Sequence, residues 1–218
     1  MSVENTILVT GYSYYSKYWF NPSGEVASAL NNLLIDNYRV VSRVFPVSFR
    51  IVTSELPMLL RELKPRVVLG LGLDPSARNI QVELVAVNYV FSDLVDVEGA
   101  QLKSLVISSE GPFTVYTTLP FREILIECGE RRLLPVRPSL KTGLYLCNVV
   151  AYLIMKYGLE HNIPAGFLHI PPSTVNMLRG ETDHGIPLNI ILETVKCILE
   201  VAVKNNKISL NREVVRYF

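Results

Sequence analysis

The hydrophobic positions along the chain follow two alternating patterns: short, continuously apolar runs and longer stretches with helical periodicity. The apolar runs are rich in β-branched residues and predict buried strands, at 6–10, 38–47, 66–70, 80–88, 103–108, 134–137 and 165–170. The periodic stretches predict helices, at 23–36, 49–63, 119–129, 142–157 and 187–203. Strands that alternate with helices are typical of α/β proteins. We therefore expect one α/β domain over residues 1–218, with a mostly parallel twisted sheet in a three-layer α/β/α arrangement.

Particular residues predict where two of these helices begin and end. Ser23 is a good N-cap for the first helix, and Thr142 is one for the fourth. Lys156 near the end of the fourth helix and Gly158 just after it predict that this helix stops there.

The composition is that of a compact globular protein and excludes several classes of partner. The 218 residues suffice for one sizeable core, and 49% of them are hydrophobic. The net charge is +1 and no basic run appears, so we expect no nucleic-acid partner. The longest apolar run, 144–155, is interrupted by Asn148 and is too short to cross a bilayer, so no membrane partner is expected. Residues 1–6 lack the charged start and apolar core of a signal peptide.

The number and spacing of the cysteines indicate the cellular compartment of the protein. Cys128, Cys147 and Cys197 form no CxxC pair, and an odd number suits no complete disulfide framework. This predicts a reducing, cytoplasmic setting in which the thiols stay free.

The stretch 142–148 places one of these thiols in the first part of the fourth helix. Cys147 would lie one to two turns from Thr142, within the apolar run. The partial positive charge at a helix N-terminus stabilises a thiolate. The alternative is a buried cysteine that packs as a small hydrophobic side chain.

A thiol nucleophile needs a base, and the base needs an orienting group. His169 ends the strand at 165–170, at the sheet edge where ligands bind in parallel α/β proteins. Glu83 is the one charge within the strand at 80–88. A structural histidine and a solvent-facing glutamate are the alternatives for these two residues.

Two loops are candidates for contact with a ligand. The stretch 12–20 follows the first strand and is dense in aromatic residues, which predicts either a cover over a pocket or a contact between subunits. The stretch 70–76, with Leu73, is a turn-rich loop at the carboxyl end of the third strand.

Six short motifs follow one another along the chain, namely Thr10-Gly11 with Asn21-Pro-Ser23, Glu83-Leu-Val-Ala-Val-Asn88, Glu98-Gly99, Tyr116-Thr-Thr-Leu-Pro120, Gly143-Leu-Tyr-Leu-Cys-Asn148 and Gly166-Phe-Leu-His-Ile-Pro171. In this order and at this spacing they resemble the pyroglutamyl peptidase I (pyrrolidone carboxyl peptidase) family of cysteine peptidases. The resemblance runs from about residue 6 to residue 203.

The resemblance implies a role for each candidate residue. Cys147 would be the nucleophile, His169 the base and then the acid, and Glu83 the group that orients the imidazole. Substrate contacts would come from three positions in the two loops, Tyr12, Tyr15 and Leu73. The reaction would remove an N-terminal pyroglutamate from peptides through an acyl-enzyme, with no metal and no cofactor. The family is typically cytoplasmic and homotetrameric, so a small peptide and further copies of the chain are the expected partners.

The chain departs from the family pattern at three places: in the opening loop, after the Glu83 strand, and in the run Ser139-Leu-Lys-Thr142 before the nucleophile motif. Tyr12 and Tyr15 stand at the aromatic positions of the opening loop, but Ser16 and Lys17 replace its glycines, which predicts a pocket of changed shape and polarity. Asp93 stands where the family has an arginine thought to stabilise the oxyanion, and loss of one such donor costs about 100- to 1000-fold in rate.

Two cations, on Arg78 and Lys141, are candidates to compensate for that arginine. Two further interpretations stay open: a related thiol amidase or acyl hydrolase with a changed substrate, and a non-catalytic α/β binding protein that retains the three residues.

Overall fold

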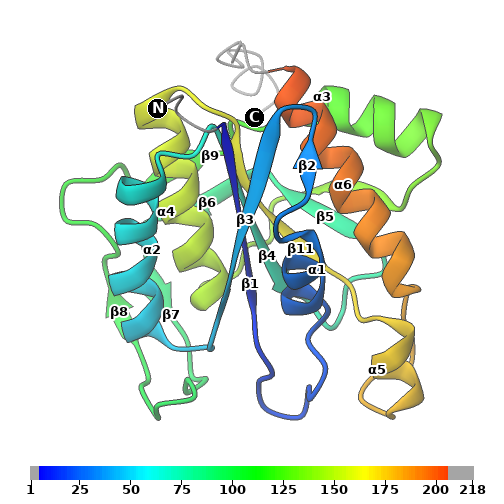
Figure 1. Ribbon diagram of the computed structural model, residues 1–218. Coiled ribbons are helices and arrows are strands. Elements are labelled where there is room, and N and C mark those ends of the chain that lie inside the picture. The colour runs from blue at the N-terminus through cyan, green and yellow to red at the C-terminus, as the bar shows by residue number, and fades with distance from the viewer. Residues whose placement is uncertain (1–4, 206–218) are drawn as a thin grey trace.

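A mixed, mostly parallel sheet of seven strands forms the centre of the protein in a computed structural model that describes residues 5–205 (Figure 1). The strand order is β10-β5-β11-β4-β1-β3-β2. The strands are β1 (Thr6–Tyr12), β2 (Leu34–Ile35), β3 (Tyr38–Phe45), β4 (Val67–Leu73), β5 (Ile80–Glu83), β10 (Val136–Ser139) and β11 (Ala165–Ile170). Antiparallel pairs occur where β5 meets β11 and where β2 meets β3, and the other neighbours are parallel. The predicted mostly parallel sheet is therefore confirmed.

Two small antiparallel ribbons lie outside this sheet. One pairs β6 (Val85–Val87) with β9 (Thr114–Tyr116), and the other pairs β7 (Val90–Phe91) with β8 (Lys103–Leu105). The predicted strand at 80–88 is thus split at Leu84, so that its first half lies in the main sheet and its second half in a ribbon.

Helices cover both faces of the main sheet, which confirms the three layers (Figure 1). One face carries α2 (Phe49–Leu63) and α4 (Leu146–His161), and the other carries α1 (Pro22–Leu30) and α6 (Leu188–Lys204). The shorter helices are α3 (Phe121–Ile124), the π-helix η1 (Leu125–Arg131) and α5 (Thr174–Leu178). Within the described residues, no helix is long and apolar enough to cross a membrane.

Burial on both faces explains why the strands read as continuous apolar runs. Ile7 and Val9 of β1 pack into the core on the α1 and α6 side, whereas Leu8 packs into the core on the α2 and α4 side. Successive side chains of a strand point to opposite faces, so a strand between two helical layers needs apolar residues at every position.

Several predicted boundaries are corrected by local contacts. The first helix is capped by Asn21, whose side chain accepts from the Ser23 N–H, so Ser23 is not the cap. That helix ends at Leu30 instead of about residue 36, because the chain turns into β2. The strands predicted at 6–10 and 66–70 extend further, and the latter takes in Leu73 of the predicted loop. Residues 1–4, most of the segment expected to lack a signal peptide, lie outside the described range.

The fourth helix also differs from its prediction at both ends. It begins at Leu146 with Tyr145 as its N-cap, while the Thr142 hydroxyl donates to the Val85 carbonyl at 2.6 Å. The helix continues past Gly158 to His161. Gly158 permits close packing instead of ending the helix, because a Cβ there would lie 2.4 Å from the Cβ of Ala165.

A disulfide joins Cys128 of η1 to Cys197 of α6, so the prediction of three free thiols is wrong. Both cysteines are fully buried, and they are 69 residues apart in the chain. They meet because η1 and α6 pack side by side on the same face of the sheet. Cys147 alone keeps a free thiol, since the structure describes all three cysteines.

Removal of this disulfide is expected to lower the free energy of unfolding by about 2 to 5 kcal/mol, because a crosslink across a long loop restricts the unfolded chain. The double variant Cys128→Ala/Cys197→Ala should therefore show a lower denaturant midpoint than the wild-type protein. Alkylation of Cys147 in the folded double variant should proceed at the wild-type rate. Equal midpoints for the variant and the oxidised wild type would contradict the expectation.

Candidate active site

Three side chains from different elements converge at the carboxyl end of β11. Glu83 is the last residue of β5, His169 is next to the end of β11, and Cys147 is the second residue of α4. β5 and β11 are neighbours, with Gln81 paired with His169 and Glu83 paired with Phe167. The fold thus brings together three residues that lie far apart in the sequence.

Glu83 and His169 form a buried pair inside the sheet. The Nδ1 atom of His169 lies 2.7 Å from Oε1 of Glu83, and the Glu83 side chain is fully buried. The second oxygen, Oε2, accepts from the backbone N–H of Lys141 at 2.9 Å. A buried carboxylate needs such partners. The solvent-facing alternative for Glu83 is therefore wrong.

Cys147 is the second neighbour that acts on the His169 ring. Burial lowers the pKa of His169, but the hydrogen bonds to Cys147 and Glu83 outweigh burial and raise this pKa to about 10. The imidazole is therefore protonated at neutral pH, between a sulfur and a carboxylate. This arrangement is that of a thiol with an adjacent acid–base group and an orienting carboxylate.

The absence of a side chain at Gly72 leaves room for the sulfur of Cys147. Gly72 of β4 is paired with His169, and a Cβ on Gly72 would lie 2.8 Å from Cys147 Sγ. The same Cβ would lie 2.7 Å from the ring of Phe167, which packs edge-on against His169 with its centroid 5.3 Å away. The close packing of β4 against β11 therefore restricts the positions that the thiol and the imidazole can take.

A cavity of about 200 Å³ opens beside the Cys147 thiol. Apart from that thiol, its lining side chains carry no formal charge. The lining includes the three predicted substrate residues, Tyr12, Tyr15 and Leu73. Among the lining residues that were not predicted as substrate contacts are Tyr145 and Leu94. The position of Tyr145, two residues before Cys147, was an available signal, whereas Leu94 is an exposed loop residue with no local signal.

None of the charged residues discussed for the oxyanion lines this cavity. Asp93 has 81% of its side-chain surface exposed and pairs with Lys103 at 3.0 Å. Lys141 contributes its backbone N–H to Glu83, and its side chain lines a separate cavity with Arg137. Arg78 is exposed and also lies outside the lining. Between residues 5 and 205, no group of three or more His, Cys, Asp or Glu side chains is placed to hold a metal ion.

Comparison with known proteins agrees with this geometry. A sequence model of the family described as pyroglutamyl peptidase matches residues 5–205. This chain belongs to the pyroglutamyl peptidase family. The predicted family resemblance is thereby confirmed over nearly the whole described chain.

Individual relatives are similar over three quarters or more of their length. The pyrrolidone-carboxylate peptidase of Pyrococcus furiosus is 31% identical over 204 residues, which cover 91% of this chain and 98% of that protein. The enzyme of the same name from Thermococcus litoralis is 34% identical over 167 residues, 76% of each chain. A crystal structure of the P. furiosus pyrrolidone carboxyl peptidase superposes with a TM-score of 0.86 at 30% identity, covering 92% of this chain and 99% of that one.

The substitution Gly72→Ala is expected to slow alkylation of Cys147 by iodoacetamide by about tenfold or more. The added methyl group would displace the sulfur from His169, and small misplacements of reacting groups cost up to about 100-fold. The alkylation rate is followed by intact-protein mass, and thermal unfolding is recorded for each variant.

Gly70→Ala is the matched control, because a Cβ there would meet Phe167 and Ile154 but not the sulfur. It should destabilise the protein to a similar degree and slow alkylation much less. Equal alkylation rates in the two variants would show that the lack of a side chain at Gly72 is not needed to position the Cys147 sulfur.

Proposed function

We propose that this protein is a cysteine peptidase that removes an N-terminal pyroglutamyl residue from peptides. One observation carries the proposal: the row of Glu83, His169 and Cys147 opens onto a compact cavity whose lining, apart from the thiol, is uncharged. A lactam ring is compact, uncharged and partly apolar, which suits such a cavity. Membership of the pyroglutamyl peptidase family supports the same substrate.

In the first step the Cys147 thiolate, beside the charged imidazole, attacks the carbonyl carbon that follows the lactam ring. A carbon–sulfur bond forms, the carbonyl electrons move to oxygen, and the tetrahedral intermediate collapses with loss of the peptide amine. His169 donates its proton to that amine, which leaves a neutral imidazole and a thioester on Cys147. His169 then takes a proton from water, and the resulting hydroxide forms a bond to the thioester carbonyl carbon. The carbon–sulfur bond breaks, which releases pyroglutamate and restores the thiolate beside the charged imidazole.

Glu83 is proposed to orient the imidazole and to keep it charged until the amine leaves. Its burial supports this role, because a carboxylate with no access to solvent and two fixed hydrogen bonds holds its partner in one orientation. Charge–charge attraction is also stronger in such a setting.

The oxyanion is proposed to be stabilised by backbone donors in place of the missing arginine. Cys147 is in the first turn of α4, where N–H groups have no intrahelical acceptor and the helix dipole favours negative charge. Asp93 does not oppose this, because its carboxylate faces solvent and pairs with Lys103.

We propose a cytoplasmic location and a homo-oligomer, a tetramer by family resemblance. Large apolar side chains on the surface support a subunit interface, among them Trp19 at 68%, Phe113 at 69% and Leu178 at 83% exposure. The buried disulfide is compatible with the cytoplasm of hyperthermophiles, whose intracellular proteins are rich in disulfides. P. furiosus, the source of solved relatives, is such an organism.

Cys147→Ala is expected to reduce hydrolysis of a fluorogenic pyroglutamyl amide by at least about 1000-fold, because the acyl-enzyme can no longer form. The measurement is release of the fluorophore under substrate saturation, with circular dichroism to show that the variant is folded. Turnover at the wild-type rate in this variant would exclude Cys147 as the nucleophile.

A panel of other acyl amides tests the alternative of a changed substrate. Slow pyroglutamyl turnover together with faster Cys147-dependent cleavage of another amide would support the thiol amidase interpretation. Absence of turnover on every amide, with an unreactive thiol, would support the binding-protein interpretation.

The pH dependence follows from the raised pKa of His169. The pKa of His169 in the folded protein is about 10, above the ordinary value of 6.5. The stabilisation of the folded state by the charged imidazole is therefore complete below about pH 6.5 and is lost as the pH rises through about 10. We expect kcat/KM to fall on the basic side as pH approaches 10, since the leaving amine then receives no proton.

The variant Glu83→Gln provides the control for this assignment. Removing the carboxylate takes away one of the groups that raise the pKa of His169, so the basic limb should move to lower pH. A basic limb at the same pH in both proteins would assign it to another group.

A further inference from the structure

The 92–100 loop, which joins β7 to β8, buries two polar residues and exposes its large apolar ones. Ser92 and Asp96 are buried, whereas Leu94, Val95 and Val97 are about half exposed, at 54%, 49% and 49%. Burial of apolar side chains therefore contributes little to holding this loop. Its position depends on hydrogen bonds made at two sites.

At the first site two tyrosine hydroxyls converge on one backbone oxygen. Tyr15 and Tyr145 both donate to the Val95 carbonyl, the latter at 3.1 Å, and their hydroxyl oxygens are 3.4 Å apart. A carbonyl oxygen has two lone pairs, so it can accept both bonds. Tyr15 follows β1 and Tyr145 caps α4, so one carbonyl links three segments of the chain.

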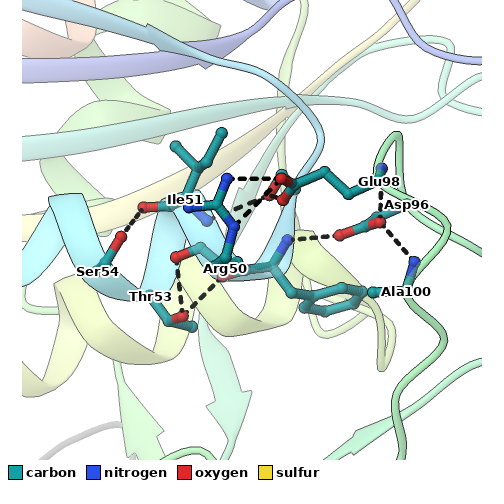
Figure 2. A network of polar contacts seen from close by, with 9 residues as sticks. Arg50, Ile51, Thr53, Ser54, Asp96, Glu98 and Ala100 are labelled. Carbon is teal, nitrogen blue, oxygen red and sulfur yellow. Dashed lines mark hydrogen bonds and ion pairs between the residues drawn. The ribbon is translucent and has the colours of Figure 1, made fainter.

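At the second site two carboxylates attach the loop to the first turn of α2. Asp96 accepts from the Phe49 N–H at 2.9 Å and from the Ala100 N–H at 2.8 Å, within its own loop. Glu98 pairs with Arg50 at 2.6 Å and accepts from the Ser48 hydroxyl. Figure 2 shows Asp96 and Glu98 turned toward this helix end, with Arg50 reaching across to Glu98.

Leu94 directly precedes Val95, the first of these anchors, and it lines the cavity together with Tyr15 and Tyr145. The two hydroxyls therefore fix how far the loop, with Leu94, lies from the tyrosine rings across the cavity. A phenylalanine would fill the same volume as either tyrosine but could not donate to Val95. Burial, more than any neighbour, raises the pKa of Tyr145 far above its ordinary value near 10, so this hydroxyl remains a donor at any working pH.

We propose that Tyr15 and Tyr145 are positioning residues whose hydroxyls, through the Val95 carbonyl, hold the 92–100 loop against the cavity and make it selective for a small five-membered lactam. This inference rests on the proposed function and adds to it the residues that determine acyl-group size. The contacts that carry it lie at the cavity wall and do not involve Glu83, His169 or the sulfur.

The double variant Tyr15→Phe/Tyr145→Phe tests the proposal while keeping both rings. Loss of two hydrogen bonds is expected to raise KM for a pyroglutamyl amide by about 5- to 30-fold with kcat within about twofold. The preference for the five-membered lactam over its six-membered homologue, measured as the ratio of kcat/KM values, should fall by a similar factor. Wild-type KM together with a wild-type ratio would overturn the proposal.

Tyr157→Phe is the matched control, because the Tyr157 hydroxyl donates to the Leu60 carbonyl at 3.2 Å, away from the cavity. It removes the same kind of bond from α4 and should leave KM and the ratio unchanged. An equal change in the control and in the double variant would reduce the effect to general destabilisation, which also overturns the proposal. Thermal unfolding of each variant shows how much stability has been lost.

A second readout does not require turnover. Chloromethyl ketones of the five- and six-membered lactams alkylate a thiol as sulfur displaces chloride, and intact-protein mass gives the rate at Cys147. The wild-type rate should favour the smaller ring, and this preference should shrink in the double variant and persist in Tyr157→Phe. An unchanged preference in the double variant overturns the loop proposal, whereas a clear preference without hydrolysis of any pyroglutamyl amide overturns the proposed function alone.

Discussion

An ionised carboxylate inside an apolar sheet is strongly disfavoured unless hydrogen bonds and an opposite charge compensate it. Glu83 is in that position, and both of its oxygens have partners, the His169 ring and the Lys141 N–H. The Glu83 contact holds the imidazole in one orientation. Cys147 and Glu83 together raise the pKa of the ring against the effect of burial, so the ring is charged at neutral pH. With one ring nitrogen on the carboxylate, the ring presents its other side to Cys147. The geometry around the thiol therefore depends on this buried pair.

Close packing of the central strands limits how the thiol and imidazole can move. Gly72 and Gly70 of β4 leave space that the Phe167 ring and the Cys147 sulfur occupy, and a methyl group at either glycine would overlap its neighbours. Phe167 in turn packs edge-on against His169. Because interiors packed to this density transmit small displacements, the rigid sheet fixes the thiol and the imidazole, while loops supply much of the lining of the cavity beside them.

The cavity and the opposite helical layer are held by different interactions. The cavity wall includes a loop that buries little apolar surface. Tyrosine hydroxyls donate to its Val95 carbonyl, and its own Asp96 carboxylate accepts from the Phe49 N–H. The layer of η1 and α6 has a covalent link, the Cys128–Cys197 disulfide, within an apolar cluster. A count of cysteines alone pointed to free thiols and a reducing compartment. The buried disulfide removes that argument, and the proposed cytoplasmic location rests on the family instead.

Local patterns in the sequence determined the elements whose own residues decide their conformation. The helix Phe49–Leu63 and the strand Ala165–Ile170 were predicted with their observed bounds, because their periodicity and flanking residues are unambiguous. Motifs at fixed spacing identified the family, and they singled out the three residues that the fold brings together and the three that line the cavity.

Contacts between distant segments were decided only by the tertiary structure. These include the disulfide between Cys128 and Cys197, the shared acceptor at Val95 and the outward orientation of Asp93. The start of α4 at Leu146 belongs with them, since the Thr142 hydroxyl donates to a ribbon strand and not to the helix. The physical reason is that each of these contacts depends on which segments pack side by side. The spacing of two residues along the chain does not determine how far apart they lie in the folded protein.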